Sequence, residues 1–386
     1  MAWNSARKAE LTDKIAAGER LSRQDGEDLY ECDDLAWLGA QAHGVRRAKN
    51  GDVVYFNVNR HLNLTNVCRA SCAYCSFERK PGAKDAYTMR VEEAVELASA
   101  MKDDGLTELH IVNGLHPTLP WKYYPRVLRE LKAVLPDVAL KAFTATEVHY
   151  FEEISGLPAT EILDELIDAG LESLTGGGAE IFDWDVRKQI VDHDTHWEDW
   201  SRIHRLAHQK GLNTPATMLY GHIEEPRHRV DHVLRLRELQ DESLQAAAGS
   251  FSVFIPLRFH NDNNRLSHLR MAQPADVLKT FAVSRLMLDN FPHVKVFWVM
   301  HGLSLSQLAL NYGADDMDGS VVEYKITHDA DGFGTPDKLT RDNLLDLIRD
   351  AGFQPKERNT RYEVIRSYDG PVPLAERRAE PQAVWA

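Results

Sequence analysis

From residue 53 onward, short β-rich runs alternate with stretches whose apolar residues recur at helical spacing. Eight candidate strands follow one another in this way: 53–64, 108–112, 138–144, 171–174, 213–219, 251–257, 294–300 and 317–322. Such alternation is typical of parallel strands joined by helices. Eight repeats predict an α/β fold in which the strands close into a TIM-type (βα)8 barrel.

The segments on either side of this pattern divide the chain. Residues 1–50 are expected to form two charged helices, residues 51–330 the barrel, and residues 331–386 a C-terminal extension that packs on the barrel. The glycine- and proline-containing stretch 332–336 is the predicted break before the extension. The extension should contain one helix, at about 339–351, and a polar tail.

The charge of the chain limits its partners. With 59 acidic and 45 basic residues the net charge is −14, which argues against nucleic acid or an anionic membrane surface. Charges interrupt the N-terminal run where a signal peptide needs an apolar core, and no stretch reaches the ~18 apolar residues of a membrane helix. We therefore expect a cytoplasmic protein, in a compartment that keeps thiols reduced.

Three of the four cysteines, Cys68, Cys72 and Cys75, lie within eight positions in a CxxxCxxC run. Soft thiolates at this spacing favour iron–sulfur ligation or zinc. A 4Fe-4S cluster held by three cysteines leaves one iron open to a small molecule, whereas structural zinc needs a fourth ligand. Cys32 lies far upstream, so a zinc site would have to be completed by a histidine such as His61.

This loop resembles that of the radical S-adenosylmethionine (SAM) superfamily, in which the motif is CxxxCxΦC and Φ is aromatic. The resemblance implies a 4Fe-4S cluster on the three cysteines, with SAM as co-substrate chelating the open iron. It also implies that Tyr74, at the Φ position, contacts the adenine of SAM.

The loops after the second and third predicted strands carry further candidates for SAM binding. In a barrel, reactive groups gather at the carboxyl ends of the strands. The resemblance implies that Asn113 and Gly114 cradle the methionine amino group, although relatives usually have two glycines here. Thr144 and Glu147 can hydrogen-bond ribose or an ammonium group. Alternatively, this segment is structural and Thr146 caps the next helix.

The fourth predicted strand is followed by three consecutive glycines, Gly176, Gly177 and Gly178. Such a run loses much chain entropy on folding, which indicates that a ligand approaches the backbone closely. N–H groups at the start of a helix can bind an anion. The alternative is a flexible linker.

Polar side chains also follow the fifth and sixth predicted strands. His222, Arg258 and His260 are the candidates for contacting an anionic substrate, since a guanidinium in a barrel mouth usually holds an anion. A single histidine in such a position is more often a hydrogen-bonded structural one. Strand alternation leaves open whether Arg258 or Leu257 faces inward.

A second resemblance covers about residues 50–330. The stretches 113–117, 146–149, 176–182, 216–224, 289–293 and 313–316 are similar to the aminofutalosine synthase family of the futalosine route to menaquinone. The run 220–241 favours this family over two relatives, dehypoxanthine futalosine cyclase and the tyrosine-using synthase of the deazaflavin pathway. The resemblance implies that a 5′-deoxyadenosyl radical adds to 3-[(1-carboxyvinyl)oxy]benzoate, followed by aryl migration and decarboxylation.

The implied partners are therefore an aryl enol ether dicarboxylate and an external one-electron reductant such as flavodoxin or ferredoxin. Two other classes of protein fit the sequence less well. A non-catalytic iron–sulfur protein commonly holds its cubane with four cysteines. A zinc hydrolase, suggested by the 17 histidines, would place paired histidines at ligand spacing on one strand end, and no such pair is found.

Overall fold

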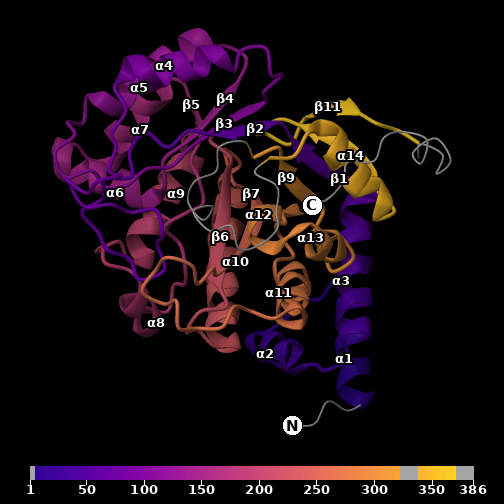
Figure 1. Ribbon diagram of the computed structural model, residues 1–386. Coiled ribbons are helices and arrows are strands. Elements are labelled where there is room, and N and C mark those ends of the chain that lie inside the picture. The colour runs from indigo at the N-terminus through magenta and orange to yellow at the C-terminus, as the bar shows by residue number, and fades with distance from the viewer. Residues whose placement is uncertain (1–4, 322–337, 371–386) are drawn as a thin grey trace.

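The computed structural model describes residues 5–321 and 338–370, and its centre is a barrel of parallel strands (Figure 1). The barrel strands are β1 (Val53–Asn57), β2 (Asn59–His61), β3 (Glu108–Ile111), β4 (Ala139–Ala142), β5 (Leu171–Ser173), β6 (Thr214–Tyr220), β7 (Phe251–Arg258), β8 (His293–Val294) and β9 (Asp316–Gly319). The predicted TIM-type α/β barrel is confirmed, and the first predicted strand is divided into β1 and β2 at Val58.

The pairing of the strands closes the barrel in chain order. Ladders run β2-β3-β4-β5, β6-β7-β8 and β9-β1, all parallel. A bridge between Lys295 and Asp316 links β8 to β9, and the Ser173 hydroxyl donates to the Asn213 carbonyl at 2.8 Å beside the gap between β5 and β6. The register of β3 and β4 pairs His110 with Lys141, so the two residues lie at the same height along the barrel axis.

Helices surround the barrel and bury apolar side chains against it. These are α4 (Val91–Ala100), α5 (Tyr123–Val134), α6 (Ala145–Ser155), α7 (Ala159–Asp168), α8 (Trp184–Ile190), α9 (Trp197–Gln209), α10 (Pro226–Ala246), α11 (Pro274–Met287), α12 (Trp298–His301) and α13 (Leu303–Leu310). Pro226 occupies the first turn of α10, where its missing N–H costs no hydrogen bond. The N-cap of α9 is His196.

The N-terminal segment forms three helices where two were expected: α1 (Ser5–Ala16), α2 (Arg23–Glu31) and α3 (Leu35–Asn50). Helix α3 packs against α11, and α2 packs against α10 and α11, so the segment covers one side of the barrel (Figure 1). Among the residues that the structure describes, no helix combines the length and the apolar character needed to cross a membrane.

The C-terminal extension takes part in the sheet itself. It contains α14 (Arg341–Asp350), close to its predicted position, and two unpredicted strands, β10 (Gln354–Arg358) and β11 (Val364–Ser367). Strand β10 pairs in parallel with β1, and β11 pairs antiparallel with β10 (Figure 1). The predicted boundary at residue 330 and the break at 332–336 lie outside the described residues.

The predicted strand 294–300 is wrong over most of its length. Only a two-residue strand, β8, forms, and Trp298, Val299 and Met300 belong to the short helix α12. Trp298 is fully buried and its indole donates to the Gly319 carbonyl at 2.8 Å. A short apolar run has no period that separates a buried strand from a buried helix, and tertiary packing decided the outcome here.

Candidate active site

The three clustered cysteines lie on the loop that follows β2 at the carboxyl end of the barrel strands. The exposed Lys80 orders this loop, because its ammonium donates to three consecutive carbonyls beginning at Cys68, at 3.2, 3.0 and 2.8 Å. The amide of Cys75 donates to the Cys72 carbonyl at 3.1 Å. These contacts hold the three thiols on one short, folded segment.

Two of these sulfurs accept hydrogen bonds from the backbone. The Leu115 N–H donates to Cys68 Sγ at 3.3 Å, and the Asp192 N–H donates to Cys72 Sγ at 3.4 Å. Such bonds commonly support thiolates that bind iron–sulfur clusters. Burial raises the pKa of Cys72 to about 12 and that of Cys75 to about 11, so thiolates here need a cationic partner such as iron. The loop therefore fits a 4Fe-4S cluster.

Two further observations bear on the choice of metal. In the part of the chain that the structure describes, no three His, Cys, Asp or Glu side chains are grouped to hold a single metal ion. A cubane instead spreads its thiolate ligands over separate iron atoms. Cys32 is fully buried elsewhere, where its thiol faces the Asp34 carbonyl at 3.6 Å.

Tyr74 joins the cysteine loop to the glycine run. Its hydroxyl donates to Glu180 Oε1 at 2.9 Å, and the same oxygen accepts the Gly178 amide at 3.1 Å. Glu180 has a φ of 46°, in the left-handed region that non-glycine residues seldom adopt. The buried Arg187 guanidinium donates to the Gly178 carbonyl at 2.8 Å and the Ala179 carbonyl at 2.6 Å, which holds this conformation in place.

The glycine run is required by the protein's own packing. A Cβ on Gly177 would lie 3.0 Å from Thr144 Cγ2, and one on Gly178, whose φ is +80°, would lie 2.3 Å from Thr146 Oγ1. The Gly178 amide is already bonded to Glu180, so it is not available to the anion that the sequence suggested. The flexible-linker alternative fails, because side chains pack tightly against the run.

The predicted SAM-binding residues Asn113, Thr144 and Glu147 form one hydrogen-bonded unit. The Glu147 carboxylate accepts the backbone and side-chain N–H groups of Asn113, both at 3.1 Å, and the Thr144 amide at 2.8 Å. Thr144 Oγ1 accepts the Glu147 amide at 3.0 Å, completing a capping box at the start of α6. Thr144 therefore caps the helix, and the alternative with Thr146 is wrong.

Burial dominates the electrostatics of Glu147. It raises the pKa to about 7, against the opposing effect of the N–H donors from Thr144 and Asn113. Next to this unit, Gly114 is needed for close approach, since a Cβ there would lie 2.4 Å from the Val67 carbonyl oxygen. The unit therefore ties the loop after β3 to the cysteine loop and to α6.

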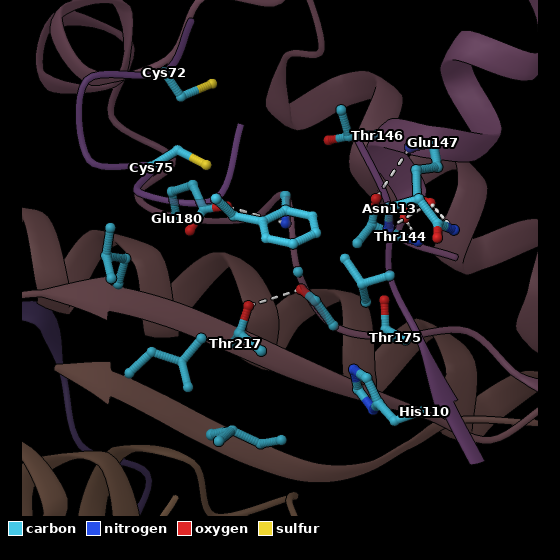
Figure 2. A pocket seen from close by; sticks show the side chains of 18 of the residues that line it. Cys72, Cys75, His110, Asn113, Thr144, Thr146, Glu147, Thr175, Glu180 and Thr217 are labelled. Carbon is cyan, nitrogen blue, oxygen red and sulfur yellow. Dashed lines mark hydrogen bonds between the residues drawn. The ribbon is translucent and has the colours of Figure 1, made fainter. Parts of the chain in front are cut away.

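These elements surround a cavity of about 290 Å3 inside the barrel. Figure 2 shows Cys72 and Cys75 on one side of it and His110 on the other. Its apolar wall includes Val112, Leu115, Pro215, Leu219, Ile255, Leu257, Phe259, Phe297 and Met300. The side away from the cysteines is polar and is lined by Asn59, His61, Glu108, His110, Lys141, Lys295 and Asp318.

We call the last set the floor of the cavity, because Glu108 begins β3 and so lies toward the amino ends of the strands. Lys141 donates to both oxygens of Glu108, at 3.0 and 3.1 Å, and Lys295 lies 3.3 Å from Asp318 Oδ1. Burial would raise the pKa of Glu108, but Lys141 and Lys295 outweigh it and lower that pKa. The Glu108 carboxylate therefore stays ionised beside Lys141. Burial also lowers the pKa of His61 to about 3.

Most predicted site residues line this cavity, and two do not. The lining includes Cys68, Cys72, Cys75, Tyr74, Asn113, Gly114, Thr144, Glu147, Gly176, Gly177, Gly178 and His260. The structure corrects the places of Arg258 and His222. The Arg258 guanidinium turns away to the Ala272 carbonyl, at 3.0 and 2.5 Å. The His222 ring accepts the Ile223 amide at 2.7 Å and faces the Leu219 carbonyl at 3.1 Å, as a structural histidine does.

The sequence reasoning missed several polar residues of the cavity, among them Glu180, Lys141 and Lys295. A signal for the lysines was present, since each lies within an apolar run that was itself predicted to be a strand. A charged residue at an interior position of a barrel strand is unusual, because these layers are commonly filled with branched apolar side chains.

Two family models match the chain. Residues 62–236 match the radical SAM superfamily, and residues 248–369 match the CofH/MqnC C-terminal region. The second match runs from before β7 through β11, so it includes both barrel strands and the extension.

Relatives and a solved structure agree with these matches. The chain is 73% identical over 385 residues to the aminodeoxyfutalosine synthase of Streptomyces coelicolor, covering 97% of this chain and 98% of that protein. It is 42% identical over 363 residues to the enzyme of the same name from Thermus thermophilus, and the match covers 93% of this chain and 96% of that protein. The FeFe-hydrogenase maturase HydG from Carboxydothermus hydrogenoformans has a TM-score of 0.71 at 17% identity, over 92% of this chain and 81% of that one. This last likeness concerns the fold alone.

Proposed function

The chain belongs to the aminodeoxyfutalosine synthases, radical SAM enzymes of the futalosine route to menaquinone, and we propose that its substrate is 3-[(1-carboxyvinyl)oxy]benzoate. Membership in the superfamily implies a 4Fe-4S cluster and SAM. In the proposed reaction the adenosyl carbon C5′ of SAM becomes bonded to the vinyl carbon of the enol ether, with aryl migration and decarboxylation.

We propose that Cys68, Cys72 and Cys75 hold the cluster. When bound, it supplies one electron to SAM, which then yields methionine and a 5′-deoxyadenosyl radical. The two N–H···S bonds and the Lys80 contacts support this assignment, because they order the loop around the sulfurs. An external one-electron reductant such as flavodoxin or ferredoxin is the proposed electron source.

Tyr74, Asn113, Gly114, Thr144, Glu147 and the glycine run are the proposed SAM-binding residues. Their support is that all of them line one cavity with the three cysteines. Glu180 joins this set, because its carboxylate fixes the Tyr74 hydroxyl and the Gly178 amide. The role of these residues is to orient SAM and to exclude water from the reacting atoms.

The observation that carries the proposed substrate is the division of the cavity into two ends. The cysteine loop follows the carboxyl end of β2, the floor includes the first residue of β3, and apolar side chains such as Leu219, Ile255 and Phe297 line the same cavity. An aryl enol ether with a carboxylate on its ring carries the matching chemical groups: a reactive vinyl carbon, an apolar ring and an anion. Apolar walls also keep exchangeable hydrogen donors away from a radical.

The experiment is an anaerobic incubation of the cluster-loaded protein with SAM, a reductant and the enol ether, with the products identified by mass. We expect an adenine-containing adduct that has lost CO2 and an equal amount of methionine. Cys72→Ala should give no adduct, whereas Cys32→Ala should keep the activity. No adduct from the wild-type protein, with turnover of tyrosine or of a dehypoxanthine futalosine instead, would contradict the proposed substrate.

A further inference from the structure

Two lysines from distant parts of the sequence meet at the floor of the cavity. Lys141 lies on β4 and Lys295 directly follows β8, and they are 5% and 2% exposed. Both line the cavity. Burying an ammonium group is costly unless a charged partner compensates it, so each lysine needs an explanation.

Each lysine has a carboxylate partner, but the two pairs differ. Lys141 bonds both oxygens of Glu108, which Thr360 also bonds at 2.8 Å. Lys295 makes a longer contact, 3.3 Å, with Asp318 Oδ1, an atom that already accepts Asn59 Nδ2 at 3.2 Å. An ammonium group carries three protons, and these contacts leave donor capacity on Lys295.

The two ammonium groups also act on each other. Burial lowers the pKa of Lys141, Glu108 opposes that effect, and the charge of Lys295 lowers the pKa further. The neutral rings of His61 and His110 stack at 4.6 Å beside them. An anion close to both lysines would relieve their mutual repulsion.

Stability alone does not account for this floor. Replacing a buried ion pair by apolar residues of similar volume is often neutral or stabilising, and barrels usually fill these layers with Val, Ile or Leu. A charged layer that lines a cavity instead offers hydrogen-bond donors to a charged group of a ligand.

We propose that Lys141 and Lys295 bind the ring carboxylate of the substrate and so determine which aryl enol ethers the enzyme accepts. This inference rests on the proposed function. The vinyl carbon must lie at the cysteine end, where SAM binds, and the side-chain carboxylate is attached to the neighbouring carbon. The ring carboxylate is the anion farthest from the vinyl group, so it reaches the floor.

The test is binding without turnover. Cluster-loaded protein with SAM and no reductant is titrated calorimetrically with the dicarboxylate and with 2-phenoxyacrylate, which lacks only the ring carboxylate. Charge-assisted hydrogen bonds should make the wild-type protein prefer the dicarboxylate by roughly 10- to 100-fold. In Lys295→Met this preference should fall to a few-fold at most, with the affinity for 2-phenoxyacrylate unchanged.

A matched control is Lys132→Met. Lys132 also bonds a carboxylate, that of Glu172 at 2.6 Å, but it lies on α5 and does not line the cavity. This variant should keep the wild-type preference for the dicarboxylate. A loss as large as that in Lys295→Met would show a general effect of removing a lysine and would overturn the assignment.

A second variant guards against misfolding. Lys141→Met alone would leave Glu108 as a buried, unpaired charge, so the pair is replaced together as Lys141→Met with Glu108→Gln. This double variant should also lose the preference. An unchanged preference in both folded, cluster-loaded variants would overturn the carboxylate site while leaving the proposed function intact. Failure of the wild-type protein to bind the dicarboxylate would overturn both.

Discussion

The hydroxyl of Tyr74 donates a 2.9 Å hydrogen bond to Glu180 and so connects the cysteine loop with the glycine run across the cavity. Burial, with the Glu180 charge next, raises the pKa of Tyr74 well above its ordinary value, so the hydroxyl keeps the proton that it donates. The aromatic position of the cysteine motif is thereby fixed by a residue more than a hundred positions away.

Replacing this hydroxyl should weaken SAM binding without loss of the cluster. Tyr74→Phe keeps the ring and removes one hydrogen bond to a carboxylate, which predicts roughly 10-fold weaker binding of SAM. The measurements are the dissociation constant for SAM and the iron content. Tyr123→Phe, which removes a 2.8 Å bond to the Met89 carbonyl outside the cavity, is the control. Equal SAM affinity in Tyr74→Phe and the wild type would show that the bond has no positioning role.

Gly177→Val should lower turnover on the order of 100-fold, because a displacement of about 1 Å at a reacting site has that effect. The new side chain would press on Thr144 Cγ2, which lies 3.0 Å from the position of a Cβ. The iron content should stay at the wild-type value, since the cysteines lie on another loop. Gly44→Val is the control, because a Cβ on this exposed glycine of α3 meets no atom within 4 Å.

A compensating substitution tests whether the contact with Thr144 causes the loss of turnover in variants of Gly177. Thr144→Ser removes Cγ2 and keeps the hydroxyl that caps α6. The milder variant Gly177→Ala should therefore recover much of its lost turnover when it is combined with Thr144→Ser. If the double variant is no more active than Gly177→Ala, the contact with Thr144 is not the reason for the glycine.

Lys80→Met should make the cluster more labile. The lysine bonds three successive carbonyls of the cysteine loop, but its side chain is half exposed, so each bond contributes modestly. We predict that a chelator removes iron about 3- to 10-fold faster from the variant than from the wild type. The rate is measured as the decay of the cluster absorbance. The exposed Lys84 provides the control variant Lys84→Met. Equal rates in both variants would mean that the loop holds its shape without Lys80.

Glu147 should make the stability of the protein depend on pH. In the folded protein the carboxyl has a pKa of about 7, whereas the ordinary value is 4.5. Between these values the folded state binds more protons than the unfolded chain, so stability falls as the pH rises through this window. Below 4.5 and above 7 this group adds no further dependence. Across this window the free energy of unfolding changes by about 3 kcal/mol at most.

Glu147→Gln removes the titration, so its thermal midpoint should rise relative to that of the wild type between pH 4.5 and pH 7.5. The measurement is anaerobic thermal unfolding of both cluster-loaded proteins across this range. Glu153→Gln, on the exposed face of the same helix α6, should follow the wild type. A constant difference between Glu147→Gln and the wild type at all pH values would show that folding leaves the pKa of Glu147 at its ordinary value.

Local patterns predicted the parts of the fold that local physics determines. The alternation of strands and helices gave the barrel, and the spacing of Cys68, Cys72 and Cys75 placed them on one loop. The glycine run was predicted to be a site of close approach, and the side chains of Thr144 and Thr146 are among the groups that pack against it.

Long-range contacts account for what the sequence did not reveal. Strand β10 joins the sheet next to β1, about 300 residues earlier in the chain, and no local pattern specifies that pairing. The inward direction of Lys141 and Lys295 depends on strand register and on partners such as Glu108. Strand alternation also does not fix which side of β7 faces inward, so Arg258 was expected to contact an anionic substrate. Its guanidinium instead donates to a loop carbonyl.

The fate of the adenosyl group tests the central claim most directly. Cluster-loaded protein is given SAM labelled with carbon-13 throughout the adenosyl group, together with a reductant and 3-[(1-carboxyvinyl)oxy]benzoate, under anaerobic conditions. We predict that the label appears in a decarboxylated adduct formed one for one with methionine. Labelled 5′-deoxyadenosine as the main substrate-dependent product, with no labelled adduct, would contradict the account.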